Sequence, residues 1–587
     1  MASFSIWDYL VLIVMLTISA AIGLYYRFTG GKQKTTKEYF LADSKVCIYP
    51  VSISLMASFM SSITLLGLST EVYTYGILFS VINLSYGFAT AISAFYYLPV
   101  FYKLQATSAY EYLEKRFGPA TRLTASITYS MQMMLYMGVV LYAPALALET
   151  VTGISRLDTI LILGFVCTFY STIGGMKAVL FTDVFQSLLM FAAIYSVIIC
   201  AAIRVGGFQA IWDISKEGGR LNFFNFDLDP TVRHTWFSLI IGGGFTYATL
   251  YACNQNQVQR LLTVKDLKKS QIAIFVNWPL FSLLSISTCF SGLALYAYYA
   301  KCDPVLDYKR ISARDQLMPL FVVEAMGNMP GLPGIFIAGI VSASLSSVSA
   351  CMNSLAAVTL EDYIKPLYSH IKGKPLMESS SALPSKITAF LYGLICVGIA
   401  FLAQYLGSIL QVSLSIFGAV GGPLLGMFTL GMFTLRGNQR GAIAGLLISV
   451  IFVLVIAFGQ PKPTAPTLPF STDECPRGPT PPKMSSRNST TEIEYFWLYK
   501  ISYMWYAPIG FCIAFFGGWF ISVVLDTFGL GGESTIYTDR NKTLINADLF
   551  TPPLAKRIRQ RNAAIIEKNF AVANGEIDRD LTDSTRF

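Results

Sequence analysis

The sequence predicts an all-α membrane protein with 13 transmembrane helices, ten of which form two inverted five-helix repeats. Three observations favour this fold class. The 587 residues are 54% hydrophobic and only 13% charged, whereas ordinary soluble domains are roughly 25% charged. Apolar runs of the length that crosses a bilayer recur from Trp7 to Asp526. Two of these runs, five apart in order, are interrupted by small or polar residues, as inverted repeats predict.

The spans are bounded by charged residues on both sides. We expect them at about residues 7–27, 48–70, 77–102, 124–150, 158–175, 178–202, 235–253, 270–300, 331–358, 387–405, 407–434, 441–459 and 501–525. The first run lacks a preceding basic segment, so we interpret it as a retained span rather than a signal peptide. The predicted organisation is a peripheral first span within 1–47, repeats at 48–202 and 235–434 joined by an external loop at 203–234, peripheral spans within 435–526, and a tail at 527–587.

The basic residues predict which side of the membrane each loop faces. Of the 43 lysines and arginines, 29 lie in one set of alternate segments, which includes the tail. Because basic loops stay in the cytoplasm, we expect a cytoplasmic tail and an extracellular amino terminus in a multi-pass protein of the plasma membrane. The Pro-rich loop 460–500 is then external, and its sequon at Asn488 predicts glycosylation there.

The cysteines and the net charge exclude several classes of site. Most cysteines lie within apolar runs and form no Cys/His spacing typical of a metal site. Cys302 and Cys475 are the only cysteines in external loops, so they form either a disulfide or two free thiols. The net charge of +9 is spread between spans and along the tail. It does not form the basic, aromatic-bearing surface that nucleic-acid binding requires, so we expect no nucleic-acid partner.

Two interrupted spans indicate where a binding site lies. The second span contains small and polar residues from Ala57 to Thr64, followed by Gly67, and the seventh contains Gly242-Gly243-Gly244. Unsatisfied backbone groups in lipid are costly, so irregular backbone at this depth lines a cavity. The alternative is that small residues simply let neighbouring helices pack closely.

The ninth span carries five serine hydroxyls and an amide within a short stretch, from Ser344 to Ser354. Such a cluster is too polar for lipid contact. Neutral oxygens suit a weakly held alkali cation that must also be released. Ser346 and Ser347, with carbonyls of Ala343 and of the second span, therefore predict a sodium cage. The alternative is that each serine bonds back to its own helix.

Asp183 precedes Gln186 in the segment GGMKAVLFTDVFQ at the start of the sixth span. Intramembrane carboxylates are usually functional, although this one could instead be solvated at a helix mouth. The two histidines, His234 and His370, lie at span edges, where we expect interfacial side chains. Neither HExxH, GxSxG nor a phosphate-binding loop occurs in the sequence, so we do not expect an enzyme.

Residues 1–530 resemble the sodium/solute symporter family. The resemblance rests on the segments PVFYKLQATSAYEYLEKRFG, GGMKAVLFTDVFQ, NQNQVQRLLTVKDL and SASLSSVSACMNSLAAVTLEDY. It implies LeuT-like inverted five-helix repeats with sodium as the coupling ion. The implied sodium site comprises carbonyls of Ala57, Met60 and Ala343 with hydroxyls of Ser346 and Ser347. An implied second cation region comprises Ser58, Asp183, Gln186 and Gln255.

Within the family, ASFMSSITLLGLSTEVYTYG resembles the branch that moves monocarboxylates, water-soluble vitamins such as biotin and pantothenate, or iodide. Sugar carriers have an acid and an amine where this chain has Asn83 and Asn277, so a small anion fits better than a sugar. The substrate pocket implied by the branch comprises Phe59, Thr64, Asn83, Tyr86 and Tyr247, although the aromatic residues could equally be bundle packing. We expect a sodium-coupled importer of small anions, with a sugar or polyol carrier, a non-transporting sensor or a leak channel as alternatives.

The tail contains two further features. A short basic run, from Lys556 to Arg561, is either a contact for anionic lipid or a solvated helix face. The final residues Thr585-Arg586-Phe587 resemble a terminus that adds a strand to a PDZ domain. We therefore expect the lipid bilayer, sodium and a small anion as partners, with a PDZ-domain protein as a further candidate.

Overall fold

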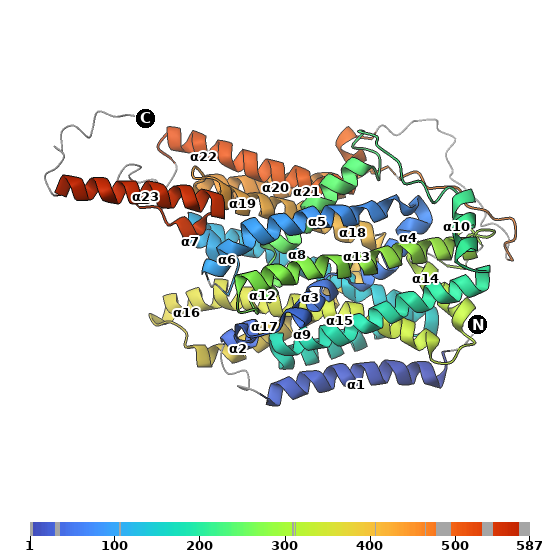
Figure 1. Ribbon diagram of the computed structural model, residues 1–587. Helices are drawn as coiled ribbons and strands as arrows, with labels where there is room; N and C mark the ends of the chain where they lie inside the picture. Colours follow the sequence, from blue (N-terminus) through green and yellow to red (C-terminus); the bar gives the residue numbers. More distant parts are fainter. Residues whose placement is uncertain are drawn as a thin grey trace.

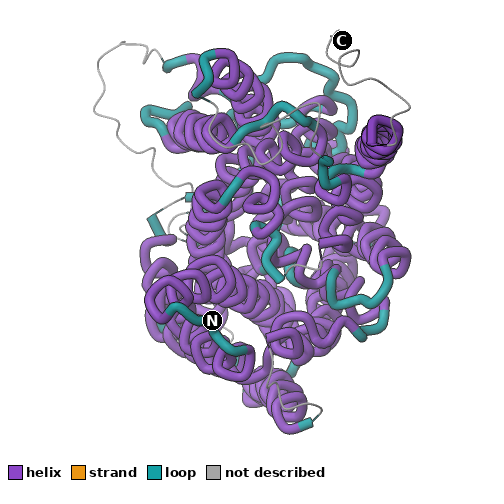
Figure 2. Tube along the Cα trace, turned by 90° about the vertical axis from the view of Figure 1, so that its left-hand side faces the viewer, coloured by secondary structure: helices purple, strands orange, loops and turns teal. Residues whose placement is uncertain are grey.

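The computed structural model describes residues 4–29, 36–104, 107–307, 310–311, 313–405, 407–463, 465–476, 495–530 and 544–573. Helix covers each of the thirteen predicted apolar runs, and the described residues contain no β-strand. The long helices lie side by side in Figure 1, and Figure 2 views the same bundle end on. Within the described residues, ten helices are individually long and apolar enough to cross a membrane, and a bent pair makes an eleventh. The all-α class is therefore confirmed.

The first half of the chain contributes the following elements. They are α1 (Ile6–Phe28), α2 (Thr36–Leu41), α3 (Ile48–Ala57), α4 (Ser62–Tyr75), η2 (Ile77–Val81), α5 (Ile82–Ile92), η3 (Ser93–Tyr97), α6 (Leu98–Leu104), α7 (Glu111–Phe117), α8 (Pro119–Thr152), α9 (Arg156–Val205), α10 (Phe208–Glu217), η4 (Ser238–Gly242), α11 (Gly243–Ala248), η5 (Thr249–Cys253), α12 (Gln255–Leu261) and α13 (Leu267–Tyr298).

The second half completes the bundle. Its elements are α14 (Leu317–Phe321), η7 (Val322–Met326), α15 (Leu332–Val358), η8 (Thr359–Ile364), α16 (Lys365–Lys372), α17 (Glu378–Ala403), α18 (Ile409–Ile416), η9 (Phe417–Gly421), α19 (Gly422–Phe433), α20 (Gln439–Phe458), η11 (Tyr503–Trp505), α21 (Tyr506–Cys512), η12 (Ile513–Gly517), α22 (Gly518–Thr527), η13 (Ala547–Leu549) and α23 (Pro552–Ala573).

Burial separates central helices from peripheral ones. The most apolar 18-residue windows of Leu332–Lys372 and Ile409–Phe433 are 94% buried, whereas that of Ile6–Tyr26 is only 17% buried. In a bilayer, apolar side chains need no protein cover, so α1 can remain at the edge. Helix α15 carries a cluster of serine hydroxyls that does not suit lipid contact, and it packs against α8, α9 and α17.

The two ends of the bundle differ, and we name each after a short helix. The α10 end, at the right of Figure 1, is where α1 begins, and the α23 end lies opposite with α7 and α16. At the α10 end, residues 459–463 and 465–476 fold over the bundle, where the Leu468 amide donates to the Thr74 carbonyl at 3.2 Å. Cys302 and Cys475 form a disulfide that joins this segment to the end of α13.

The second span is broken where the sequence predicts. Helices α3 and α4 form a bent pair with an angle of 56° between them, and residues 58–61 connect them. Span five and span six are one continuous element, α9, which bends at Gly175 with φ +62°. A side chain at Gly175 would also meet the Tyr39 ring at 2.9 Å, so both the backbone and the packing require glycine.

The seventh span breaks at a different place from the prediction. Gly242, Gly243 and Gly244 are helical, and the chain instead turns at Asn254, whose ψ is 124°. The Asn254 side chain accepts from the amide of Asn256 at 3.0 Å and so caps α12. The glycine run allows close packing, because a Cβ on Gly243 would lie 2.4 Å from Ile82.

Candidate functional site

Among the described residues, the break in the second span leaves several carbonyl oxygens without a backbone hydrogen bond. The amides of residues 58–61, 64 and 65 donate to carbonyls of Ser54, Met56, Phe59 and Ser61. None of these described bonds across the break ends on Ala57 or Met60. Both residues are fully buried, and buried carbonyls normally find a partner. Their oxygens are therefore suited to a ligand.

The hydroxyls predicted for the sodium cage face the protein interior. Ser346 and Ser347 are both fully buried, and α15 packs against α3 and α4 on either side of the break. The Ser346 hydroxyl donates to Asp183 Oδ1 at 2.6 Å. The Ser347 hydroxyl has no hydrogen-bond partner among the described residues. A buried hydroxyl without a partner is costly, so the donor set, completed by buried Ala343, fits a cation that prefers neutral oxygens.

Asp183 is buried and paired, so the alternative of a solvated carboxylate at a helix mouth is wrong. Its Oδ2 lies 3.3 Å from Arg260 Nη2 and accepts from the Ser54 hydroxyl at 2.5 Å. The Arg260 guanidinium also donates to Ser54 Oγ at 2.9 Å. The sequence places Arg260 in a cytoplasmic loop, whereas in the structure its side chain is fully buried. A buried charge needs such a partner.

The four residues of the implied second cation region make hydrogen bonds with different partners. Gln255 contacts the segment around Thr107 and Ala109, while the Gln186 amide lies 3.5 Å from Ser19. Ser58 accepts from the Gln257 amide at 3.0 Å, and Asp183 is paired with Arg260. A second cation region at Ser58, Asp183, Gln186 and Gln255 stays a prediction.

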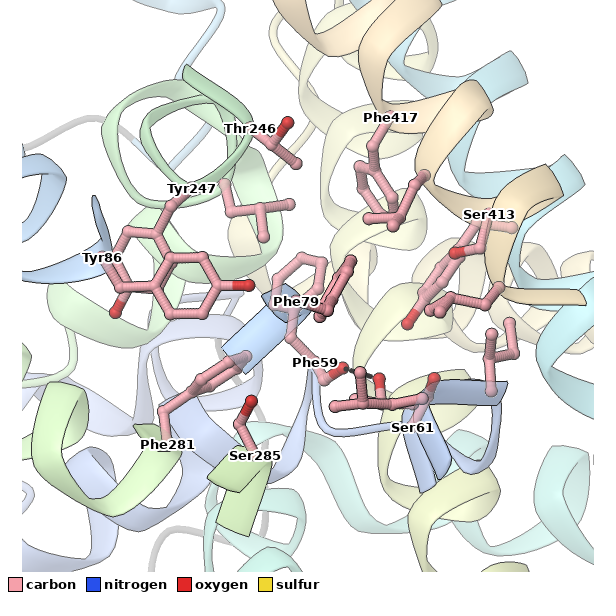
Figure 3. A pocket seen from close by; sticks show the side chains of 17 residues that line it. Phe59, Ser61, Phe79, Tyr86, Thr246, Tyr247, Phe281, Ser285, Ser413 and Phe417 are labelled. Atoms are coloured by element: carbon pink, nitrogen blue, oxygen red, sulfur yellow. Dashed lines mark hydrogen bonds between the residues drawn. The ribbon is translucent and has the colours of Figure 1, made fainter. Parts of the chain in front are cut away.

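An aromatic cavity lies beside the break, shown in Figure 3. Its volume, measured to the centre of a water-sized sphere, is about 80 Å³. Four residues of the predicted pocket line it: Phe59, Thr64, Tyr86 and Tyr247. Asn83 does not line it, because its side-chain amide donates to the Ser80 carbonyl at 2.9 Å. The sequence could not assign this orientation, since a helical position alone does not say which neighbour a side chain faces.

The cavity wall combines stacked rings with hydroxyls. The rings of Tyr86 and Tyr247 stack at 4.7 Å, and the Tyr247 hydroxyl accepts from Asn277 at 3.0 Å. Figure 3 shows this tyrosine pair on one side and Ser413 on the other. The lining residues that sequence reasoning missed are Ser61, Ile63, Leu68, Phe79, Tyr136, Thr246, Leu250, Phe281, Ser285, Leu410, Ser413, Leu414 and Phe417. None of the described lining residues is charged.

A buried ionic cluster separates this cavity from the α10 end. Arg233 holds Glu71 with two hydrogen bonds of 2.6 and 3.0 Å and reaches Gln411 at 3.1 Å. His234 Nε2 lies 3.1 Å from Glu71 Oε1 and 2.9 Å from the Tyr503 hydroxyl. We expected His234 at the interface, but its side chain is buried. Glu71 has no sequence signal beyond being an acid within an apolar run.

The bundle, its broken span and the hydroxyl-bearing helix beside the break define a membrane transporter of the LeuT fold. The family model described as the sodium:solute symporter family matches residues 39–449. The chain belongs to this family, and sodium is its coupling ion.

Several known proteins are similar over most of this chain. A Drosophila melanogaster protein named "Putative sodium-dependent multivitamin transporter" is 53% identical, covering 96% of this chain and 94% of its own. Sodium-coupled monocarboxylate transporter 1 of Mus musculus is 44% identical, covering 89% and 87%. The sodium-dependent multivitamin transporter of Oryctolagus cuniculus is 39% identical, covering 86% and 80%.

A solved structure shares the fold. It is a Na⁺-coupled sialic acid symporter in a substrate-bound, outward-open state, with a TM-score of 0.73 and 24% identity. The alignment covers 89% of this chain and 98% of that one.

Proposed function

We propose that this chain imports a small organic anion, a monocarboxylate or a water-soluble vitamin such as biotin or pantothenate, or else iodide, together with sodium. One observation carries the proposal. The break in the second span lies between α3 and α4, which both contact α15, while Phe59 and Thr64 at the break line the aromatic cavity. Sodium at the break would order the wall of the cavity, which couples the two sites. The names of the relatives support the substrate class.

The sodium site we propose consists of the carbonyls of Ala57, Met60 and Ala343 with the hydroxyls of Ser346 and Ser347. The Asp183 carboxylate accepts a hydrogen bond from the Ser346 hydroxyl. That hydroxyl can then offer only its oxygen to a cation. The negative charge of Asp183, one hydrogen bond away from this oxygen, also favours a bound cation, although the positive charge of Arg260 offsets part of this attraction.

The proposed anion site is the cavity lined by Phe59, Thr64, Tyr86 and Tyr247. No described lining residue is cationic, so the anion needs another source of positive potential. Helix α4 begins at Ser62, next to the cavity, and its free amides and dipole favour negative charge at that end. The bound sodium would supply the remaining positive potential. Neutral hydroxyls such as that of Ser413 can donate to a carboxylate without preventing its release.

We place the α10 end outside and the α23 end in the cytoplasm of a plasma-membrane protein, as the distribution of basic residues favours. Glycosylation at Asn488 and the PDZ-binding terminus at residues 585–587 stay predictions, because both lie outside the described residues. Transport would proceed by alternating access, in which each end opens in turn to the central cavity.

The test is uptake of labelled lactate, pyruvate, butyrate, biotin, pantothenate, iodide and glucose, with sodium or with choline outside. We expect uphill, sodium-dependent uptake of at least one anion and none of glucose. Ser346→Ala combined with Ser347→Ala should abolish the sodium-dependent part. The control is Ser349→Ala, because that hydroxyl only bonds back to the Ser346 carbonyl within its own helix. Uptake retained in the double variant would reject the sodium site, and current that ignores substrate would indicate a channel.

A further inference from the structure

A second, larger cavity opens at the α10 end. Its volume, measured as for the central cavity, is about 1000 Å³. We call it the vestibule. It is lined by residues 462–463 and 465–468 of the folded-over segment, by residues 499–503 and by the segment before the seventh span. Arg233, Lys462 and Lys500 line it, and no described lining residue is acidic.

Lys462 and Lys500 supply the excess positive charge of the vestibule, and Lys462 is the less exposed of the two. Arg233 is neutralised by Glu71, but Lys462 makes no ion pair with a described residue. Its ammonium donates to the Tyr506 hydroxyl at 2.5 Å and to the Ala457 carbonyl at 3.0 Å, both neutral acceptors. Burial, and then the nearby Arg233, lowers the pKa of Lys462 to about 8. Both causes disfavour the charged form, and a bound anion would relieve both.

The vestibule and the central cavity are separated by a thin partition. Leu78 lines the vestibule, whereas its neighbour Phe79 lines the central cavity. In the same way, Gln411 faces the vestibule and Leu410 the central cavity. The ring of Phe79 lies 5.3 Å from that of His234. An anion in the vestibule would therefore be separated from the central cavity only by this partition.

We propose that the vestibule is a first binding site for the carboxylate of the transported anion, with the Lys462 ammonium as its main ligand and Arg233 and Lys500 in support. The site rests on the proposed function, because it receives the same substrate from the outside. A central cavity without a cationic side chain can release its anion readily, but it attracts an anion from solution only weakly. The vestibule raises the local anion concentration before the partition opens.

The first experiment compares uptake kinetics of Lys462→Gln, Lys462→Arg and the control Lys216→Gln. Lys216 is an exposed cation on α10 that does not line the vestibule. We expect Lys462→Gln to raise KM for the anion about fivefold, in the range of one lost partly exposed charge contact. The maximal rate and the sodium dependence should stay unchanged, and Lys462→Arg should restore KM. A KM for Lys462→Gln equal to that of Lys216→Gln, at the same surface level, would overturn the site.

The second experiment does not depend on transport. Ala465 also lines the vestibule, and Ala465→Cys can be modified by thiol reagents of opposite charge, with the unmodified parent as the blank. We expect the anionic methanethiosulfonate to react about threefold faster than the cationic one, and propionate, but not propionamide, to slow it. Both effects should disappear with Lys462→Gln. Protection by propionate without sodium-driven uptake would reject the proposed function alone, and uptake without protection would reject the vestibule site alone.

Discussion

At the scale of single residues, Ser346 and Ser347 of the proposed sodium site differ in their hydrogen bonding. The Ser346 hydroxyl donates a hydrogen bond to Asp183 at 2.6 Å, so its oxygen is oriented. Ser347 has no partner among the described residues and would gain one when a ligand binds. Charge-assisted hydrogen bonds are roughly twice as strong as neutral ones. In the proposed sodium site, Asp183 would therefore act on the cation through Ser346 rather than as a direct ligand.

Asp183→Asn tests this role. The substitution keeps a polar partner for Ser346 but removes the negative charge behind it, so sodium should bind more weakly. We expect the sodium concentration for half-maximal uptake to rise about tenfold, equivalent to about 1.4 kcal/mol. The measurement is labelled uptake against sodium concentration, per transporter at the surface. Asp158→Asn, an exposed acid in the first turn of the same helix, is the control. An unchanged sodium dependence would remove Asp183 from the coupling.

At the scale of elements, hydropathy predicted the spans because each span is a property of contiguous residues. The break in the second span and the serines of α15 were predicted for the same reason. The pairing of Asp183 with Arg260 was not, because the two lie 77 positions apart and Arg260 looks like an ordinary loop residue next to a span. Asn83 was predicted to line the substrate pocket, whereas its side-chain amide donates to the Ser80 carbonyl. The sequence does not fix which neighbour this side chain faces.

The glycine run of the seventh span was also misinterpreted, and it offers a matched pair of substitutions. A Cβ on Gly243 would lie 2.4 Å from Ile82 and 2.7 Å from the Ser85 hydroxyl, whereas one on Gly244 would meet nothing closer than 3.8 Å. Overpacking a tight interface costs about 1–3 kcal/mol. We expect Gly243→Ala to lower the melting temperature of the purified protein and Gly244→Ala to leave it nearly unchanged. Equal melting temperatures would show that the α11–α5 contact can relax.

At the scale of the whole molecule, four distant parts of the chain meet where the central cavity is closed toward the α10 end. They are α4 through Glu71, the segment before η4 through Arg233, α18 through Gln411, and η11 through Tyr503. Helix α4 continues from the break at the sodium site, and α18 lines the aromatic cavity. In the proposed mechanism, sodium binding, substrate binding and closure of the cavity would therefore involve the same helices. A change at one of these sites can shift the balance between open and closed states.

Breaking the ionic cluster should open the cavity toward the α10 end. Arg233→Gln leaves Glu71 as a buried charge without its guanidinium, which costs several kcal/mol and is relieved when the cluster meets water. We expect a cysteine at the cavity wall, Ser413→Cys, to react with an impermeant thiol reagent added outside at least about tenfold faster when Arg233 is changed, since tenfold requires only about 1.4 kcal/mol. Adding Glu71→Gln removes the unpaired charge and should return the rate toward its original value, because residues in one network do not act additively. If Arg233→Gln leaves the reaction rate of this cysteine unchanged, the cluster is a fixed part of the fold and the cavity must open elsewhere.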